Sequence, residues 1–154
     1  MDVQNDLMVT GGHDGFVRVG RTSDGAEQLR WQAHEHRITC LTVNKNGNRI
    51  YTGTHGGEIA ISDAHGQKIT SLVAHVGPVL CLELSANGET LFTGGHDRRI
   101  LVWDALTGDL QREIPAHTDR VMDLEFLSGD AGLLSSGFDG AVNRWGYAED
   151  APGQ

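Results

Sequence analysis

The chain has 154 residues, 38% of them apolar, with 21 acidic against 12 basic side chains and a formal net charge of −9. This length and apolar content predict one folded domain with its own core and exclude a disordered chain. The negative charge disfavours nucleic acid as the partner and leaves a basic peptide open, and neither an 18-residue apolar run nor a signal-peptide pattern is present, so we expect a cytoplasmic protein that binds no membrane.

Short strands separated by turn residues are predicted along the whole chain. Near the N-terminus, an alternating strand at 16–19 follows the glycine-rich segment TGGHDG. Two series of four strands come next, at 38–43, 49–52, 58–62 and 68–72, and at 79–84, 90–93, 99–103 and 110–114. The last series has three strands, at 121–126, 132–135 and 141–145.

One pattern recurs four times, and its fullest copy is TGGHDRRILVWD at 93–104. Its first residue carries a hydroxyl in every copy, with spacings of 42, 41 and 42 residues, and a second column lies four residues further on and a third ten. An Ala-His pair precedes each copy after the first. The columns are Thr10, Thr52, Thr93 and Ser135; Asp14, Gly56, Asp97 and Asp139; Gly20, Ser62, Trp103 and Trp145; and Ala33-His34, Ala74-His75 and Ala116-His117. A period of 40–45 residues that combines such a histidine with a Trp-Asp dipeptide is typical of a propeller blade.

On these motifs the chain resembles the WD40 family over residues 7–146. The resemblance implies that the histidine, hydroxyl, aspartate and tryptophan of each repeat form a hydrogen-bonded structural tetrad. Two complete tetrads are implied: His75, Thr93, Asp97 and Trp103, and His117, Ser135, Asp139 and Trp145. The second copy has Gly56 and Ser62 where aspartate and tryptophan should stand, and the first has no upstream histidine.

The predicted fold class is therefore all-β, a WD40-type β-propeller segment with two complete four-stranded blades flanked by two partial, three-stranded blades. We expect this segment to span 1–147, with repeats at about 1–32, 33–73, 74–115 and 116–147 and a flexible tail at 148–154. Joining the two partial blades would supply six strands to a four-stranded blade, so simple closure fails. An open arc leaves two apolar blade faces in water. We therefore expect two copies to form a ring of about eight blades, or another polypeptide to complete the propeller.

The cysteines and histidines are interpreted as non-catalytic. Cys40 and Cys81 occupy the same position of successive repeats, which favours two free thiols within inner strands over a disulfide. His13, His55 and His96 recur at spacings of 42 and 41. Repeats spread such positions around a ring instead of gathering them, so we expect no metal and no other cofactor.

Two enzyme-like patterns are also weighed and rejected. Histidine, aspartate and a hydroxyl occur together in the tetrads, but the resemblance implies a structural network with no activated nucleophile. The segment TGGHDG resembles a phosphate-binding loop, yet a strand follows it where a helix is needed. The chain is therefore not expected to be an enzyme, and a metal-dependent hydrolase is the least favoured alternative.

The remaining hypothesis is a non-catalytic scaffold that binds a protein or peptide. WD40 proteins commonly bind partners on the face formed by the loops between outer and inner strands and the turns between second and third strands. The candidate partner-binding residues on that face are His36, Arg37, Arg98, Asp119 and Arg120, because arginine in particular pairs well with carboxylates. The alternative is a purely architectural subunit of a larger complex, without a ligand on this face.

Overall fold

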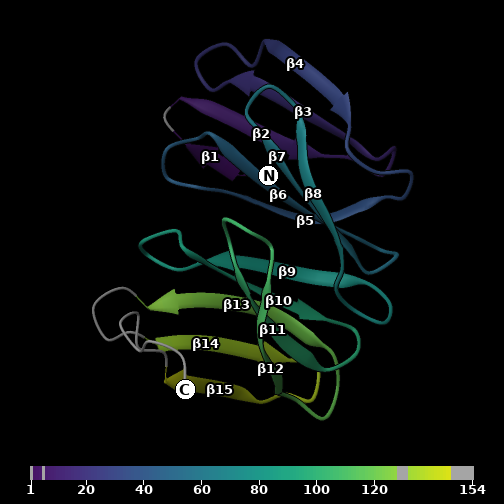
Figure 1. The fold of residues 1–154 in the computed structure, drawn as a ribbon, viewed down its shortest axis with the longest axis vertical. Coiled ribbons are helices and arrows are strands. Elements are labelled where there is room, and N and C mark those ends of the chain that lie inside the picture. The colour runs from purple at the N-terminus through teal and green to yellow at the C-terminus, as the bar shows by residue number, and fades with distance from the viewer. Residues whose placement is uncertain (1, 5, 128–131, 147–154) are drawn as a thin grey trace.

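Antiparallel strands in four sheets make up the protein. The computed structural model describes residues 2–4, 6–127 and 132–146, and within these ranges the sheets follow one another along the longest axis of the molecule (Figure 1). The strands are β1 (Asp2–Gln4), β2 (Leu7–Gly11), β3 (Phe16–Arg21) and β4 (Glu27–Gln32) in the first sheet; β5 (Ile38–Val43), β6 (Arg49–Thr54), β7 (Glu58–Asp63) and β8 (Lys68–Val73) in the second; β9 (Val79–Leu84), β10 (Thr90–Gly95), β11 (Arg99–Asp104) and β12 (Leu110–Pro115) in the third; and β13 (Val121–Leu127), β14 (Gly132–Gly137) and β15 (Val142–Gly146) in the fourth.

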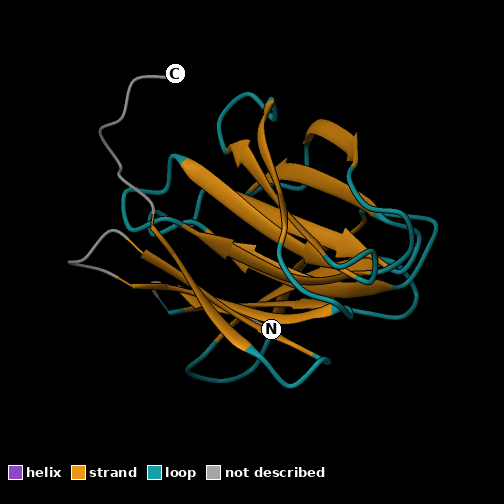
Figure 2. Ribbon diagram, turned by 90° about the horizontal axis from the view of Figure 1, so that it is seen from below, coloured by secondary structure: helices purple, strands orange, loops and turns teal. Residues whose placement is uncertain are grey.

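Each sheet is a meander in which consecutive strands pair, so each corresponds to one blade. No helix occurs in the described ranges (Figure 2), and hence none that is long and apolar enough to cross a membrane. The prediction of an all-β, WD40-type propeller segment is confirmed. Its expected inner strands at 38–43 and 79–84 match β5 and β9, and the other predicted strands overlap observed ones.

The first blade differs from the expectation of three strands. It contains a fourth, β1, which pairs with β2 in the register Asp2↔Val9, Val3↔Met8 and Gln4↔Leu7. Only two residues separate these strands, and the second of them, Asp6, has φ 63°, a left-handed conformation that suits a tight hairpin. A three-residue strand is too short to show an apolar alternation, so the sequence pattern missed it. The fourth blade has three strands in the described ranges, and the expected tail at 148–154 lies outside them.

The hydrophobic core lies between neighbouring sheets. Alternate side chains of an inner strand point to opposite faces of the sheet and pack against different neighbouring blades. The outer strands β4, β8 and β12 are largely exposed. Between the third and fourth sheets, Phe92 stacks on Phe126 with ring centroids 6.0 Å apart. Between the second and third, the Tyr51 hydroxyl donates to the Ala105 carbonyl at 3.1 Å. Such contacts hold adjacent blades in a fixed relation, which positions the loops that join them.

Cys40 and Cys81 are free thiols, as predicted. They lie on the inner strands β5 and β9, where burial raises the pKa of Cys40 to about 12 and also raises the pKa of Cys81. Both groups therefore stay protonated at neutral pH, which disfavours the reactive thiolate.

Candidate functional site

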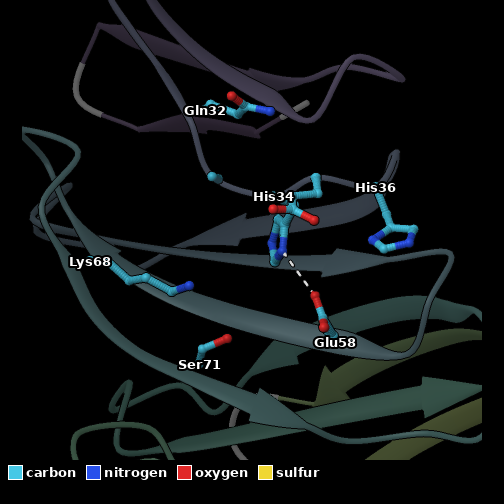
Figure 3. A pocket seen from close by; sticks show the side chains of 8 residues that line it. Gln32, His34, His36, Glu58, Lys68 and Ser71 are labelled. Carbon is cyan, nitrogen blue, oxygen red and sulfur yellow. Dashed lines mark ion pairs between the residues drawn. The ribbon is translucent and has the colours of Figure 1, made fainter.

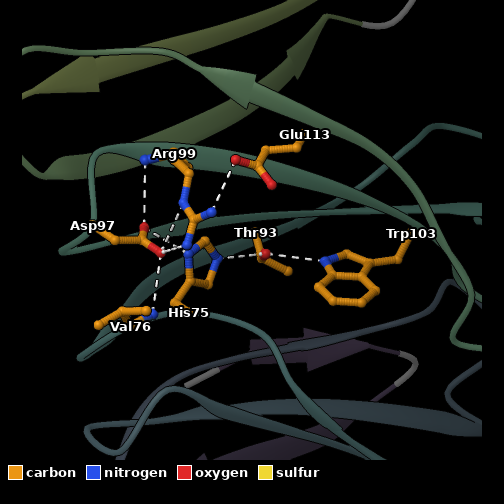
Figure 4. A network of polar contacts seen from close by, with 7 residues as sticks. All are labelled: His75, Val76, Thr93, Asp97, Arg99, Trp103 and Glu113. Atoms are coloured by element: carbon orange, nitrogen blue, oxygen red, sulfur yellow. Dashed lines mark hydrogen bonds and ion pairs between the residues drawn. The ribbon is translucent and has the colours of Figure 1, made fainter.

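A chain of hydrogen bonds crosses the third blade from its core to its loops (Figure 4). Trp103 Nε1 donates to Thr93 Oγ1 at 3.1 Å, Thr93 Oγ1 lies 2.8 Å from His75 Nε2, and His75 Nδ1 lies 2.8 Å from Asp97 Oδ1. The indole can only donate and the carboxylate can only accept, so each proton in the series points from Trp103 towards Asp97. The structure thus brings together all four residues of the tetrad implied by the sequence.

The electrostatics of this network fix its protonation state. Burial lowers the pKa of His75, against the opposing hydrogen bond to Asp97. Burial raises the pKa of the Asp97 carboxyl, but hydrogen bonds from His75 and Arg99 outweigh it and leave the pKa below its usual value. The pair is therefore a neutral imidazole and a carboxylate at pH 7. Asp97 Oδ2 also accepts from the backbone N of Val76 at 3.1 Å and from Arg99 at 2.8 Å, which ties the loop before β9 to the turn before β11.

The fourth blade repeats this network. His117 Nδ1 lies 3.1 Å from Asp139 Oδ1, His117 Nε2 lies 2.8 Å from Ser135 Oγ, and Trp145 Nε1 donates to Ser135 at 2.9 Å. Asp139 Oδ2 accepts from the backbone N of Thr118 at 2.8 Å. Backbone hydrogen bonds lower the pKa of Asp139 to about 2. The second implied tetrad is therefore also assembled.

The second blade keeps only the inner half of the network. His34 Nε2 lies 2.8 Å from Thr52 Oγ1, whereas Gly56 and Ser62 stand at the positions of aspartate and tryptophan. The nearest carboxylate to His34 Nδ1 belongs to Glu58, at 3.9 Å. No repeat column indicates Glu58, because it lies two residues beyond the aspartate column and matches an arginine, Arg99, in the third blade.

In the first blade the aspartate has a different partner. Asp14 pairs with Arg18 on β3, and this hydrogen bond lowers the pKa of Asp14 to about 2. The column is thus occupied by a carboxylate in three blades, but only two of these carboxylates hold a histidine.

The networks do not present a reactive group to solvent. Thr93 and Ser135 are 0% and 1% exposed, so neither hydroxyl can meet a substrate in this conformation. In the described ranges no three His, Cys, Asp or Glu side chains converge as a metal site requires. What the networks do is hold the loops at one end of the blades.

These loops and turns form one surface, here called the loop face. It consists of the loops from outer to inner strands and the turns from second to third strands. Backbone hydrogen bonds join the two sets: His55 N donates to Arg37 O at 3.1 Å, His96 N to Pro78 O at 2.9 Å and Phe138 N to Arg120 O at 2.9 Å. Each blade's turn is therefore fixed against a neighbouring loop.

The five candidate partner-binding residues all lie on the loop face. His36, Arg37 and Arg98 are exposed, whereas Asp119 and Arg120 are half-buried. The guanidinium of Arg120 lies 4.3 Å from the ring centroid of Phe138, which is itself 61% exposed. Phe138 is an addition to the candidates, because no repeat column distinguishes it.

The histidine networks predict that acid weakens the fold. Unfolded histidine has a pKa of about 6.5, and burial lowers the pKa of His34 and of His75 below this value in the folded protein. Between the folded and the unfolded pKa the unfolded chain binds more protons than the folded protein. The contribution of these histidines to the free energy of unfolding is therefore fully present above about pH 6.5 and is lost as the pH falls towards the folded pKa. A second decrease in stability is expected as the pH falls below 3.8, because the pKa of the Asp139 carboxyl is lowered from 3.8 to about 2 in the folded protein.

Urea unfolding at pH 7.5, 5.5 and 3 measures both steps. We expect the midpoint to decrease at each step. The matched control is His55→Gln, which removes an exposed imidazole outside the networks and should follow the wild-type curve. A midpoint that is equal at pH 7.5 and 5.5 would contradict the assignment of neutral buried histidines.

Comparison with known proteins agrees with this geometry. A model of the family "WD domain, G-beta repeat" matches residues 25–63, 66–104 and 108–146, and the chain belongs to this WD40 repeat family. The F-box-like/WD repeat-containing protein TBL1X of Homo sapiens, and that of Macaca fascicularis, are each 26% identical over 136 residues. The alignment covers 79% of this chain and 24% of either relative, so the chain spans about a quarter of their length.

A solved structure is similar over nearly the whole chain. The crystal structure of the computationally designed Ika4 protein has a TM-score of 0.83 and 27% sequence identity, and the match covers 96% of this chain and 89% of that one. The arrangement of the four sheets is therefore one that a solved protein also adopts.

Proposed function

We propose that this chain is a non-catalytic, cytoplasmic scaffold that binds a protein or peptide partner through its loop face. Membership of the WD40 repeat family supports an interaction role, and the free thiols of Cys40 and Cys81 suit a reducing compartment. The residues of this chain that we propose contact the partner are the exposed His36, Arg37 and Arg98, together with Arg120 and Phe138.

The observation that carries this proposal is the backbone of Arg98. It has φ 72°, whereas the same turn position in the other three blades is glycine: Gly15, Gly57 and Gly140, with φ of 77°, 89° and 79°. A Cβ at Gly15 or Gly57 would lie 2.1 Å from the carbonyl oxygen of His34 or His75, so in these two blades the position also favours glycine sterically, whereas the space at Gly140 is open. An arginine costs stability here. An exposed side chain kept at such a cost is best explained by a function outside the fold.

Arg98→Gly separates function from folding. Because glycine adopts positive φ without strain, we expect the free energy of unfolding to stay the same or rise by roughly 1 kcal/mol. Partners captured from cell extract by the wild-type protein should be lost or strongly reduced with Arg98→Gly and with Arg37→Glu. Quantitative mass spectrometry of the captured proteins measures this.

The matched control is Arg112→Glu, which makes the same charge change as Arg37→Glu but on the exposed outer strand β12. It should retain every partner. Equal recovery with wild type, Arg98→Gly and Arg37→Glu would refute loop-face binding and favour the purely architectural subunit.

We further propose that the arc of four blades is completed by a second copy of the chain. Supporting this, Leu134 and Val142 stand on the face of the fourth sheet that no other described strand covers, here called its free face, at the positions where the third sheet buries Phe92 and Ile100 against its neighbour. Val142 is 71% exposed, while Ile100 is 0% exposed. Another blade packed there would remove this apolar surface from water.

Light scattering tests the self-association. A mass of twice 16.6 kDa is expected for the wild type, and Val142→Asp should give a folded monomer because the side chain is exposed within one copy. A wild-type monomer at every concentration would overturn the two-copy ring and leave a different polypeptide as the completing partner.

A further inference from the structure

The second blade lacks the aspartate of the tetrad, but it keeps the groups that bind this aspartate in the third and fourth blades. In the third blade, Asp97 accepts from His75 Nδ1 at 2.8 Å and from the backbone N of Val76 at 3.1 Å. In the fourth blade, the carboxylate of Asp139 makes the corresponding contacts at 3.1 and 2.8 Å. A histidine N–H and the next backbone N–H thus converge on one acceptor in both complete networks.

In the second blade these two donors are His34 Nδ1 and the backbone N of Glu35, and Gly56 supplies no acceptor. Among the described residues no acceptor lies within hydrogen-bond distance of His34 Nδ1, because the Glu58 carboxylate is 3.9 Å away, and the backbone N of Glu35 donates no backbone hydrogen bond. The space is open, because a Cβ placed on Gly56 would meet no atom closer than 3.7 Å. A cavity of about 450 Å³ lies here (Figure 3), lined among others by Gln32, His34, Glu35, Glu58 and Lys68.

Nδ1 is the ring nitrogen of His34 on the side of Glu58 and the cavity. The Thr52 hydroxyl lies 2.8 Å from His34 Nε2 and 3.4 Å from the Ala60 carbonyl oxygen. In the third blade the Trp103 donor and the Asp97 acceptor fix the corresponding tautomer, and the second blade lacks both. An acceptor bound in the cavity therefore selects the tautomer with the proton on Nδ1, in which the Thr52 hydroxyl donates to Nε2. The side chain of His34 is only 2% exposed, so its orientation is fixed by packing.

The charges around the cavity decide which acceptor fits. Burial lowers the pKa of His34, so the imidazole is neutral at pH 7. Glu35 and Glu58 contribute two negative charges and Lys68 one positive charge, which leaves the lining net negative. A second carboxylate close to Glu58 would be repelled. A neutral group with an acceptor at one end and a donor at the other satisfies both the N–H pair and Glu58.

We propose that this cavity binds the primary carboxamide of an asparagine or glutamine side chain from a protein partner. The carboxamide oxygen accepts from His34 Nδ1 and from the backbone N of Glu35, and its NH₂ group donates to the carboxylate of Glu58. Glu58 is 44% exposed and so is free to reach the amide. The existence of the binding site is inferred from the cavity and its lining, whereas its use by a protein partner rests on the proposed scaffold function.

Acetamide is the probe, with acetate and methylammonium as the charged alternatives at equal ionic strength. In ¹H–¹⁵N spectra of the full chain we expect acetamide to shift the Glu35 amide and the His34 imidazole resonances saturably, and the two ions to leave them unchanged. The third blade is an internal control, because Asp97 already occupies the equivalent site. The resonances of His75 and Val76 should therefore not move.

Two variants sharpen the result. Gly56→Asp places a carboxylate beside His34 Nδ1 and the backbone N of Glu35, and it should abolish the acetamide shifts. Glu58→Gln should weaken acetamide binding. Saturable shifts with acetate would overturn the carboxamide in favour of an anion site, and shifts with methylammonium would do so in favour of a cation site. An absence of acetamide shifts in the wild type would refute the site itself. The scaffold function is judged separately, by the partners lost with Arg98→Gly.

Discussion

Thr93→Val is expected to lower the free energy of unfolding by about 2–5 kcal/mol, because it strands two buried groups while keeping the shape of the side chain. Thr93 is 0% exposed and its hydroxyl bonds both His75 Nε2 and Trp103 Nε1. Valine offers neither a donor nor an acceptor, so both ring nitrogens lose their partner in a place that water does not reach. Urea denaturation followed by tryptophan fluorescence and circular dichroism measures the change.

Thr52→Val is the matched control in the incomplete network. Thr52 is 2% exposed and has only one ring partner, His34, because Ser62 replaces the tryptophan. We expect a smaller loss of about 1–2 kcal/mol. Equal losses at the two threonines would mean that the tryptophan hydrogen bond contributes nothing, and losses below about 1 kcal/mol at both would mean that the networks do not stabilise the blades.

The second large effect is expected for Phe92→Ala, at about 3–5 kcal/mol. Phe92 is 1% exposed, and its ring stacks at 21° to that of Phe126 between the third and fourth sheets. Truncation removes this stacking and leaves a cavity that the two twisted sheets cannot close without shifting. The same urea titration measures it, and hydrogen exchange should show the fourth sheet losing protection first.

Phe138→Ala supplies the comparison, since Phe138 is 61% exposed on the loop face. Its ring contacts the Arg120 guanidinium, so a loss of about 0.5–1 kcal/mol is expected. If Phe92→Ala cost no more than this, the packing between the third and fourth sheets would not be a main source of stability.

The sequence predicted those features that the repeat period records. Columns of threonine, aspartate and tryptophan identify the members of each tetrad before any distance is known, because residues one period apart occupy equivalent places in successive blades. One further column of the same alignment indicates an unusual backbone position. Gly15, Gly57 and Gly140 form a column whose third-blade member is Arg98, and a lone arginine among glycines already indicates a side chain in a left-handed backbone position.

Other features could not be predicted because they depend on how side chains pack across blades. Arg120 is half-buried and its guanidinium lies over the ring of Phe138, which the repeat pattern does not place. Glu58 reaches towards His34 only because Gly56 leaves the space open. β1 was missed for a different reason, since three residues give no periodicity to detect.

Burial between sheets also determines where the protein is least rigid. Among the described residues, the second and third sheets each have a packed neighbour on both sides, whereas the first and fourth are packed on one side. In such a linear array, cooperativity passes only from neighbour to neighbour, and opening begins at the ends. A molecule that covers the free face of the fourth sheet would therefore also stiffen the loop that carries Asp119 and Arg120. The proposed assembly and the proposed binding of a partner would then be thermodynamically linked, although they would use different surfaces of the same blade.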